Sequence, residues 1–504
     1  MVMKYNLFAA ILWITLHSCQ NTTKENISET VDLEDYRPAY HFTPQSGWMN
    51  DPNGMIYLDG EYHLFFQHNP DTTVWGPMHW GHAISKDMIT WEEQPIALYP
   101  DSLGTIFSGS AVLDKDNTAG FGKNALVAIF THHNHDLEQK KTGLHQYQSL
   151  AYSVDKGRSW TKYEGNPVLP NPGIWDYRDP KVMWHEESQQ WIMTLATKQT
   201  ITFYGSKNLK NWTRLSEFGE GVGAHGGVWE CPDLLKFTTS EGDKWVLLVS
   251  INPGGPNTGS ATQYFVGDFD GKTFNSAQKD TKWMDHGPDN YAGVTFSNIP
   301  NRNILMGWMS NWAYAGAVPA STWRSGMTIA RELGLKKKED QWLLTSTPIK
   351  ELATYQKKDL NDKPTEITDG QWEIDIAKFN NTFDATFDME GTSSFEIKLS
   401  NEAGNELSFG YDHAKNEYYI DRSKAGQVDF SDTFVKRAIV PRIVTGAPGS
   451  FRFLIDRNSV ELFADDGVSN LSGLYFIQKP FSKLQLFGHA IEPSQFTVKG
   501  LIFE

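Results

Sequence analysis

Cysteine, long apolar runs and excess positive charge are all scarce in this chain of 504 residues. Its two cysteines, Cys19 and Cys231, cannot build a disulfide framework, so the size of the core must supply the stability. The apolar run from Leu7 to Leu16, interrupted only by Thr15, is too short to span a bilayer. The formal net charge of −16 provides no basic surface for a polyanion, so the sequence predicts no nucleic-acid partner.

The N-terminus has the pattern of a targeting signal. Lys4 precedes the apolar run, and the residues Leu16 to Cys19 follow it in an order that resembles a bacterial lipoprotein signal. We therefore expect residues 1–19 to be a signal peptide with Cys19 lipidated, and the polar residues 20–37 to be a flexible tether. His17 departs from the usual lipoprotein pattern, which leaves a plain cleaved signal peptide as the alternative. The expected location is extracytoplasmic, either anchored to a membrane in the periplasm or at the cell surface, or secreted.

One pattern recurs along the first two thirds of the chain. A short apolar strand is followed by a turn with Asp or Asn, and then by an aromatic residue that opens the next strand. These aromatic residues are Trp91, Trp160, Trp212 and Phe274. Intervals of roughly 50–70 residues are typical of four-stranded propeller blades with uneven loops. The sequence therefore predicts an all-β fold that begins with a propeller.

Acidic residues stand just ahead of proline in three segments, at Asp51, Asp179 and Glu230. Pro52 fixes φ and Gly54 permits a tight bend, so we expect Asp51 to be held in a rigid polar turn. A preorganised carboxylate suits covalent catalysis. The alternative is that these are ordinary turns.

Five polar residues recur on a similar period, one for each expected structural unit. They are Asp51, Ser108, Asp179, Glu230 and Asp289. A radial fold would bring one such side chain from each unit to its axis. This spacing predicts five blades.

Three motifs carry a family resemblance: Trp48-Met49-Asn50-Asp51-Pro52-Asn53-Gly54, Arg178-Asp179-Pro180 and Trp229-Glu230-Cys231-Pro232. Together they resemble the signatures of glycoside hydrolase family 32, the β-fructofuranosidases. Further matching segments occur in family order from about residue 38 to 340, among them 65–70, 80–83, 107–110 and 307–314. The resemblance implies a five-bladed β-propeller over 38–345 and a C-terminal β-sandwich over 355–504, where short alternating strands and turn signals continue.

The resemblance also implies roles for the acidic residues. Asp51 would be the nucleophile and Glu230 the acid/base, its pKa raised by the apolar neighbours Val228, Trp229 and Cys231. Asp179 would hydrogen-bond fructose hydroxyls, although Arg178 with Asp179 could instead form an ordinary ion pair. The family positions that bind substrate correspond to Asn50, Gln67, Trp75, Phe107, Ser108, Arg178, Asp289 and Trp312.

Two features leave the substrate pocket open to other interpretations. Trp75 and Trp312 could be core aromatics, since most tryptophans in sheet-rich proteins simply pack. Asn290 replaces an aromatic residue common in the family, which puts the local shape of the pocket in doubt.

The implied activity is retaining hydrolysis of terminal β-D-fructofuranosyl residues from levan or inulin, with sucrose as a further candidate substrate. An endo-acting levanase or inulinase and a fructosyltransferase would share the same catalytic residues. A non-catalytic fructan-binding propeller would be expected to have lost Asp51 or Glu230, and both are present. Substrate and, through Cys19, a membrane are the expected partners.

Two motifs that could hold other ligands lack the context that such sites need. Residues 221–226 fit a dinucleotide-binding glycine pattern but lack a βαβ unit. His132, His133 and His135 lack a supporting carboxylate or cysteine at metal-ligand spacing. The sequence therefore predicts neither a cofactor nor a metal.

Overall fold

The computed structural model describes residues 33–357, 364–368, 370–388, 393–446, 449–488 and 496–503. Cys19, the expected signal peptide and most of the expected tether lie outside these residues. The chain from residue 33 onward forms one compact unit. None of the helices in the described ranges combines the length and apolar character needed to cross a membrane.

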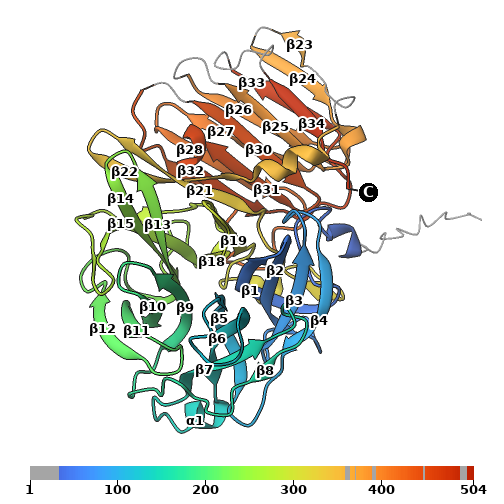
Figure 1. Ribbon diagram of the computed structural model, residues 1–504. Helices are drawn as coiled ribbons and strands as arrows, with labels where there is room; N and C mark the ends of the chain where they lie inside the picture. Colours follow the sequence, from blue (N-terminus) through green and yellow to red (C-terminus); the bar gives the residue numbers. More distant parts are fainter. Residues whose placement is uncertain are drawn as a thin grey trace, which may run out of the picture. The chain divides into compact units, whose positions relative to one another are not determined.

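Five antiparallel sheets follow one another along residues 47–348 (Figure 1). The first contains β1 (Gly47–Leu58), β2 (Glu61–Asn69), β3 (His79–Ser85) and β4 (Glu92–Leu98), with the short β20 (Trp323–Arg324) parallel to β1. The second contains β5 (Thr105–Asp114), β6 (Ala125–His133), β7 (Gln146–Ser153) and β8 (Thr161–Lys162). The third contains β9 (Tyr177–His185), β10 (Gln190–Thr197), β11 (Thr200–Ser206) and β12 (Thr213–Phe218). The fourth contains β13 (Val228–Thr239), β14 (Gly242–Asn252), β15 (Ala261–Phe269), β16 (Phe274–Asn275) and β17 (Lys282–Trp283). The fifth contains β18 (Tyr291–Thr295), β19 (Asn303–Trp308), β21 (Arg331–Lys338) and β22 (Gln341–Pro348).

The five sheets pack against one another in a closed cycle. Apolar side chains of the first and second sheets share one cluster, those of the second and third another, and the same holds for the third with the fourth and the fourth with the fifth. The fifth sheet then packs against the first, where Tyr291 and Trp308 meet Met49 and Leu64. This cycle brings the first strands of all five sheets toward a common centre.

The predicted repeat is confirmed in the outer strands. Trp91, Trp160 and Trp212 directly precede β4, β8 and β12, and Phe274 opens β16. In the first three sheets, a serine at the end of the third strand and an Asp or Asn two residues later accept backbone N–H bonds in the turn. Asx-type and Ser-type turns of this kind satisfy backbone donors locally.

Two further sheets make up the C-terminal part. The first runs in the order β23 (Thr365–Thr368), β24 (Gln371–Asp375), β33 (Lys483–Phe487), β26 (Phe395–Ser400), β27 (Glu406–Asp412), β28 (Glu417–Lys424) and β29 (Arg437–Pro441). The second runs in the order β32 (Ser469–Leu474), β31 (Ser459–Ala464), β30 (Ser450–Asp456), β25 (Phe383–Asp388) and β34 (Thr497–Gly500). Their inward-facing residues share one core, as in a β-sandwich.

Helical structure in the described ranges is limited to short segments. These are α1 (His135–Gln139) and the 3₁₀ turns η1 (Leu33–Tyr36), η2 (Ala315–Ala317), η3 (Lys350–Tyr355), η5 (Ala377–Phe379) and η6 (Asp465–Gly467). The all-β prediction is confirmed.

Candidate active site

Each of the five sheets has an irregularity of register in its first strand. The shifts fall at residues 49–52 of β1, 106–109 of β5, 178–181 of β9, 230–233 of β13 and 291–294 of β18. Asp179, Cys231 and Ala292 at these sites have φ values of 64°, 45° and 53°. A bulge turns side chains out of the regular alternation of a strand. These five bulges therefore aim side chains toward the centre of the cycle.

The local structure around Asp51 differs from the predicted turn. Residues 47–58 form one strand, β1, with register shifts on both sides of Pro52 and Asn53. Gly54 is nevertheless required, because its φ is 52° and a Cβ there would lie 2.8 Å from the Phe65 and Trp80 rings. The turn prediction is wrong because the bend is absorbed by bulges within a paired strand.

A cavity of about 420 Å³ lies where these strands converge. Its walls include the three predicted catalytic residues and most of the predicted substrate-binding residues: Asn50, Asp51, Gln67, Trp75, Phe107, Ser108, Arg178, Asp179, Glu230 and Trp312. Residues from four different sheets therefore meet at one site.

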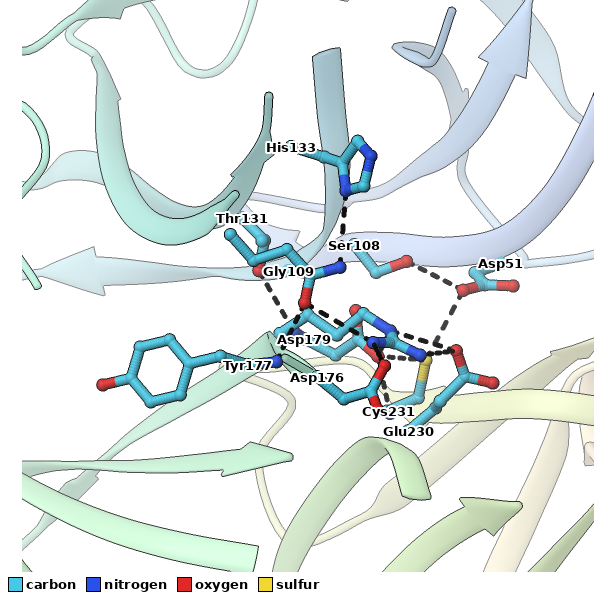
Figure 2. Close-up of polar contacts among 12 residues, drawn as sticks. Asp51, Ser108, Gly109, Thr131, His133, Asp176, Tyr177, Asp179, Glu230 and Cys231 are labelled. Carbon is cyan, nitrogen blue, oxygen red and sulfur yellow. Dashed lines mark hydrogen bonds and ion pairs between the residues drawn. The ribbon is translucent and has the colours of Figure 1, made fainter. Parts of the chain in front are cut away.

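Asp51 is held by two hydrogen bonds. Ser108 Oγ donates to Oδ2 at 2.8 Å (Figure 2), and Asn50 Nδ2 donates to Oδ1 at 3.0 Å. The thiol of Cys231 lies 3.5 Å from Oδ2. Burial raises the pKa of the Asp51 carboxyl, and the nearby Glu230 carboxylate raises it further. The two hydrogen bonds partly oppose these effects because they stabilise the ionised form.

Glu230 has polar partners rather than the apolar surroundings predicted from the sequence. Arg178 donates to Oε1 from Nε at 3.1 Å and from Nη2 at 2.9 Å, and the Tyr291 hydroxyl donates to Oε2. Trp229 points away and packs in the cluster between the third and fourth sheets. Glu230 was expected to be desolvated by Val228, Trp229 and Cys231. It instead contacts the Arg178 guanidinium and the Tyr291 phenol.

Asp179 lies deeper in the site. Its Oδ2 accepts the backbone N–H of Cys231 at 3.1 Å, and Arg178 Nε lies 3.9 Å away. Burial raises the pKa of Asp179 to about 7, although Arg178 opposes this shift and Glu230 adds to it. Arg178 is thus shared between Asp179 and Glu230. The ion pair considered as the alternative role of Arg178 and Asp179 therefore exists, and both residues line the cavity.

Asp289 does not line the cavity, which corrects its assignment as a substrate-binding residue. It is completely buried, and its carboxylate accepts hydrogen bonds from Arg422 of β28, the Tyr314 hydroxyl and the Leu474 N–H. These partners occupy both oxygens. The residue two positions later, Tyr291, reaches Glu230 instead. Tyr291 was not among the substrate-binding residues predicted from the sequence.

The family models settle the relationship. The model for the glycosyl hydrolases family 32 N-terminal domain matches residues 41–348, and the model for the C-terminal domain matches residues 344–499. This chain belongs to glycoside hydrolase family 32. The resemblance drawn from its motifs is thereby confirmed, and the protein is a glycosidase.

Individual relatives and solved structures agree. The chain is 43% identical over 501 residues to a levanase of Bacillus subtilis, covering 96% of this chain and 73% of that protein. It is 40% identical over 483 residues to an extracellular exo-inulinase of Aspergillus niger, covering 88% and 89%. The structure of an exo-inulinase from Aspergillus awamori superposes with a TM-score of 0.82 at 35% identity, covering 93% and 98%. That of a β-fructofuranosidase from Schwanniomyces occidentalis complexed with fructosyl-erythritol gives 0.82 at 32% identity, covering 94% and 99%.

Aromatic side chains form much of the cavity rim in this family 32 chain. Trp75 is 41% exposed, and its ring meets Phe107 edge to face at 6.2 Å. Trp312 stacks on Trp48 at 6.0 Å, so its position is fixed from behind. The prediction that Trp75 and Trp312 face the pocket, rather than the core alone, is supported by their place in its lining.

One wall of the cavity was not predicted from the sequence. Its residues are His133, His135, Glu138, His145, Gln146, Trp175 and Asp176. Trp175 is 40% exposed and lies two residues before the start of β9 in the third sheet, a signal that could have been noticed. His133 ends β6, His135 and Glu138 belong to α1, and His145 directly precedes β7. Only the fold places them beside Arg178.

Proposed function

We propose that this glycosidase is a retaining exo-fructanase that removes terminal β-D-fructofuranosyl residues from levan or inulin, with sucrose as a further candidate substrate. The names of the relatives at 40–43% identity, levanase and exo-inulinase, support this substrate class. The observation that carries the proposal is that Asp51, Asp179 and Glu230, from three different sheets, line one cavity.

In the proposed mechanism, Asp51 attacks the anomeric carbon while Glu230 protonates the leaving oxygen. The glycosidic bond breaks as the bond to Asp51 forms, giving a fructosyl-enzyme. Glu230 then takes a proton from water, which attacks the same carbon and releases Asp51. Two inversions give net retention, and such pairs lie about 5–5.5 Å apart.

Other residues of the cavity would bind the fructose unit. Ser108 and Asn50 hold Asp51 in one orientation, as a preorganised nucleophile requires. Asp179 would accept hydrogen bonds from fructose hydroxyls as positive charge develops. Gln67 is buried in the cavity wall, and its Nε2 has no hydrogen-bond partner among the described residues. It is therefore a free donor for a sugar hydroxyl.

The isosteric variants Asp51→Asn and Glu230→Gln test the two catalytic roles. Each should lower kcat by about 10³-fold or more, because an amide keeps the shape but cannot attack or protonate. A substrate whose leaving group needs no protonation should restore the first step in Glu230→Gln but not in Asp51→Asn. The surface variant Asp268→Asn, which loses only an ion pair with Lys244, is the control. Normal turnover in either folded catalytic variant would refute the assignment.

Exo action is proposed because large aromatics surround the cavity, which suits a chain end better than its middle. Early products from levan and inulin should be almost entirely fructose, with long polymer persisting. An early ladder of short oligosaccharides would instead indicate an endo-acting enzyme. New oligosaccharides formed mainly at high sucrose concentration would indicate a fructosyltransferase.

We also propose that the five sheets are the blades of a five-bladed propeller over residues 38–345, followed by a sandwich domain over 355–504. The closed cycle of clusters between the sheets supports this division.

An extracytoplasmic location, with a lipid on Cys19, is proposed from the sequence pattern. The relatives described as extracellular support the location alone. Mass spectrometry of the mature chain and membrane fractionation of Cys19→Ala test the anchor. A wholly soluble chain without lipid would exclude it.

A further inference from the structure

Three side chains with nitrogen and oxygen donors meet in the cavity wall that sequence reasoning missed. His133 ends β6, and His135 and Glu138 lie three residues apart on α1. Asn134 caps α1, its Oδ1 accepting the Leu137 N–H at 3.0 Å, so the two α1 side chains share one face. Both imidazoles point at the same oxygen: Glu138 Oε2 lies 3.1 Å from His133 Nε2 and 3.3 Å from His135 Nδ1.

These separations match the edges of a zinc coordination tetrahedron. Zinc binds imidazole nitrogen and carboxylate oxygen at about 2.0–2.2 Å, so neighbouring ligand atoms in a tetrahedral site lie about 3.3 Å apart. One ligand atom from each of the three residues lies within 4.8 Å of the other two. Two histidines and one glutamate are also a recurrent zinc ligand set in which a fourth position stays open. All three residues line the cavity, so an open position would face it.

We propose that His133, His135 and Glu138 form a Zn²⁺ site in the wall of the substrate cavity, and that zinc bound there inhibits hydrolysis. No metal was predicted from the sequence because no carboxylate had been connected with the histidines. Glu138 supplies it.

A chain of polar contacts connects this site with Glu230 (Figure 2). Gln146 Nε2 lies 3.4 Å from His133 Nδ1, and Gln146 Oε1 accepts from Tyr177 N–H at 2.8 Å and from Arg178 Nη1 at 3.4 Å. Arg178 in turn donates twice to Glu230. His133 also stacks on Phe107 with ring centroids 4.3 Å apart and planes at 4°. A change in the position of His133 would therefore affect both the Glu230 carboxylate and Phe107 at the aromatic rim.

Zinc on Nε2 of His133 requires the ring proton to sit on Nδ1, since a neutral imidazole has one donor and one acceptor nitrogen. Two donors, the Nδ1–H and the Gln146 amide, would then face each other. Gln146 must move, and Arg178 then loses its hydrogen bond to Gln146 Oε1. We expect zinc to lower kcat more than it raises KM for this reason. This kinetic effect depends on the proposed role of Glu230, whereas zinc binding itself does not.

Zinc binding is measured on the full-length, tag-free protein by calorimetry and by metal analysis after dialysis. The wild type should bind one Zn²⁺ per chain at this site. His135→Ala and Glu138→Gln should each weaken binding by about 10- to 100-fold or more, since even second-shell changes have effects of this size. His413→Ala, which alters an exposed histidine of the C-terminal part, should bind as the wild type does.

Kinetics with and without Zn²⁺ test the inhibition, each variant being compared with itself in metal-free buffer. Zinc should lower kcat in the wild type and in His413→Ala, and this loss should disappear in His135→Ala and Glu138→Gln. Absence of binding, or equal affinity in all four proteins, would overturn the site. Binding lost in the two variants without any effect of zinc on wild-type kcat would overturn the inhibition while leaving the site and the proposed function standing. Inactivity of the metal-free wild type on fructans would refute the proposed function alone.

Discussion

At the scale of single residues, the ionisation of Asp51 is set by opposing contacts. Burial and the Glu230 carboxylate raise its pKa, while Asn50 and Ser108 lower it by hydrogen bonding to the ionised form. A nucleophile must be ionised to attack, so its pKa fixes the lower end of the active pH range. The Ser108 contact, at 2.8 Å, is the shorter of the two hydrogen bonds.

Ser108→Ala should therefore move the acidic limb of the kcat/KM profile to higher pH. Loss of the Ser108 donor destabilises the ionised carboxylate and therefore raises the pKa of Asp51 further. The pH profile of hydrolysis measures the shift. Ser216→Ala removes a hydroxyl that bonds only a surface carbonyl and should leave the limb in place. An unchanged limb in Ser108→Ala would show that another group controls it.

The three acidic residues could be predicted from the sequence because each lies one or two positions before a proline in a recognisable motif. Their partners could not. Tyr291 reaches Glu230 across 61 positions of sequence, and Asp289 turns away to Arg422, 133 positions later. Nothing local to residue 289 distinguishes a carboxylate that faces a sugar from one that faces a buried guanidinium.

At the scale of secondary-structure elements, bulges in β1 supply the bend near Asp51 that was expected to come from a turn. The aromatic repeat identified the outer strands because it lies within single short segments. A bulge, in contrast, is defined by pairing with a neighbouring strand, so the sequence of β1 or β13 alone does not reveal it. Cys231 shows the consequence: its φ is 45°, and its backbone N–H and thiol both face carboxylates of the site.

Replacing Cys231 with valine should therefore destabilise the fold more than replacing it with alanine. A β-branched side chain is poorly tolerated at positive φ, and such strain costs about 1–3 kcal/mol. Both variants lose the thiol contacts, but the alanine side chain is not branched at Cβ. Urea unfolding of both variants gives the difference directly. Equal stability of the two variants would mean that the bulge relaxes without cost.

At the scale of the whole described unit, buried charges join the strand cycle to the C-terminal sheets. His41, ahead of β1, lies 2.8 Å from Asp456 and 3.3 Å from Glu461. Arg331 of β21 contacts Glu461 at 3.1 Å and Asp285 at 2.7 Å. These partners are far apart in sequence and were not predicted, because a lone buried histidine gives no sign of which carboxylates will surround it. Such networks are costly to break, since an unpaired charge would remain buried.

The charge on His41 predicts how stability depends on pH. Burial alone would lower its pKa, but hydrogen bonds to Asp456 and Glu461 outweigh this effect and raise the pKa to about 9, from an ordinary value of 6.5. A raised pKa means that the folded state holds the proton more tightly than the unfolded state. The stabilisation is therefore complete below pH 6.5 and is lost as the pH rises through 9, with a size on the order of 3 kcal/mol. Urea unfolding at pH 6.5 and 9.5 should show wild type losing about that much more stability than His41→Gln, which cannot titrate. An equal loss in both proteins would show that a group other than His41 binds the proton.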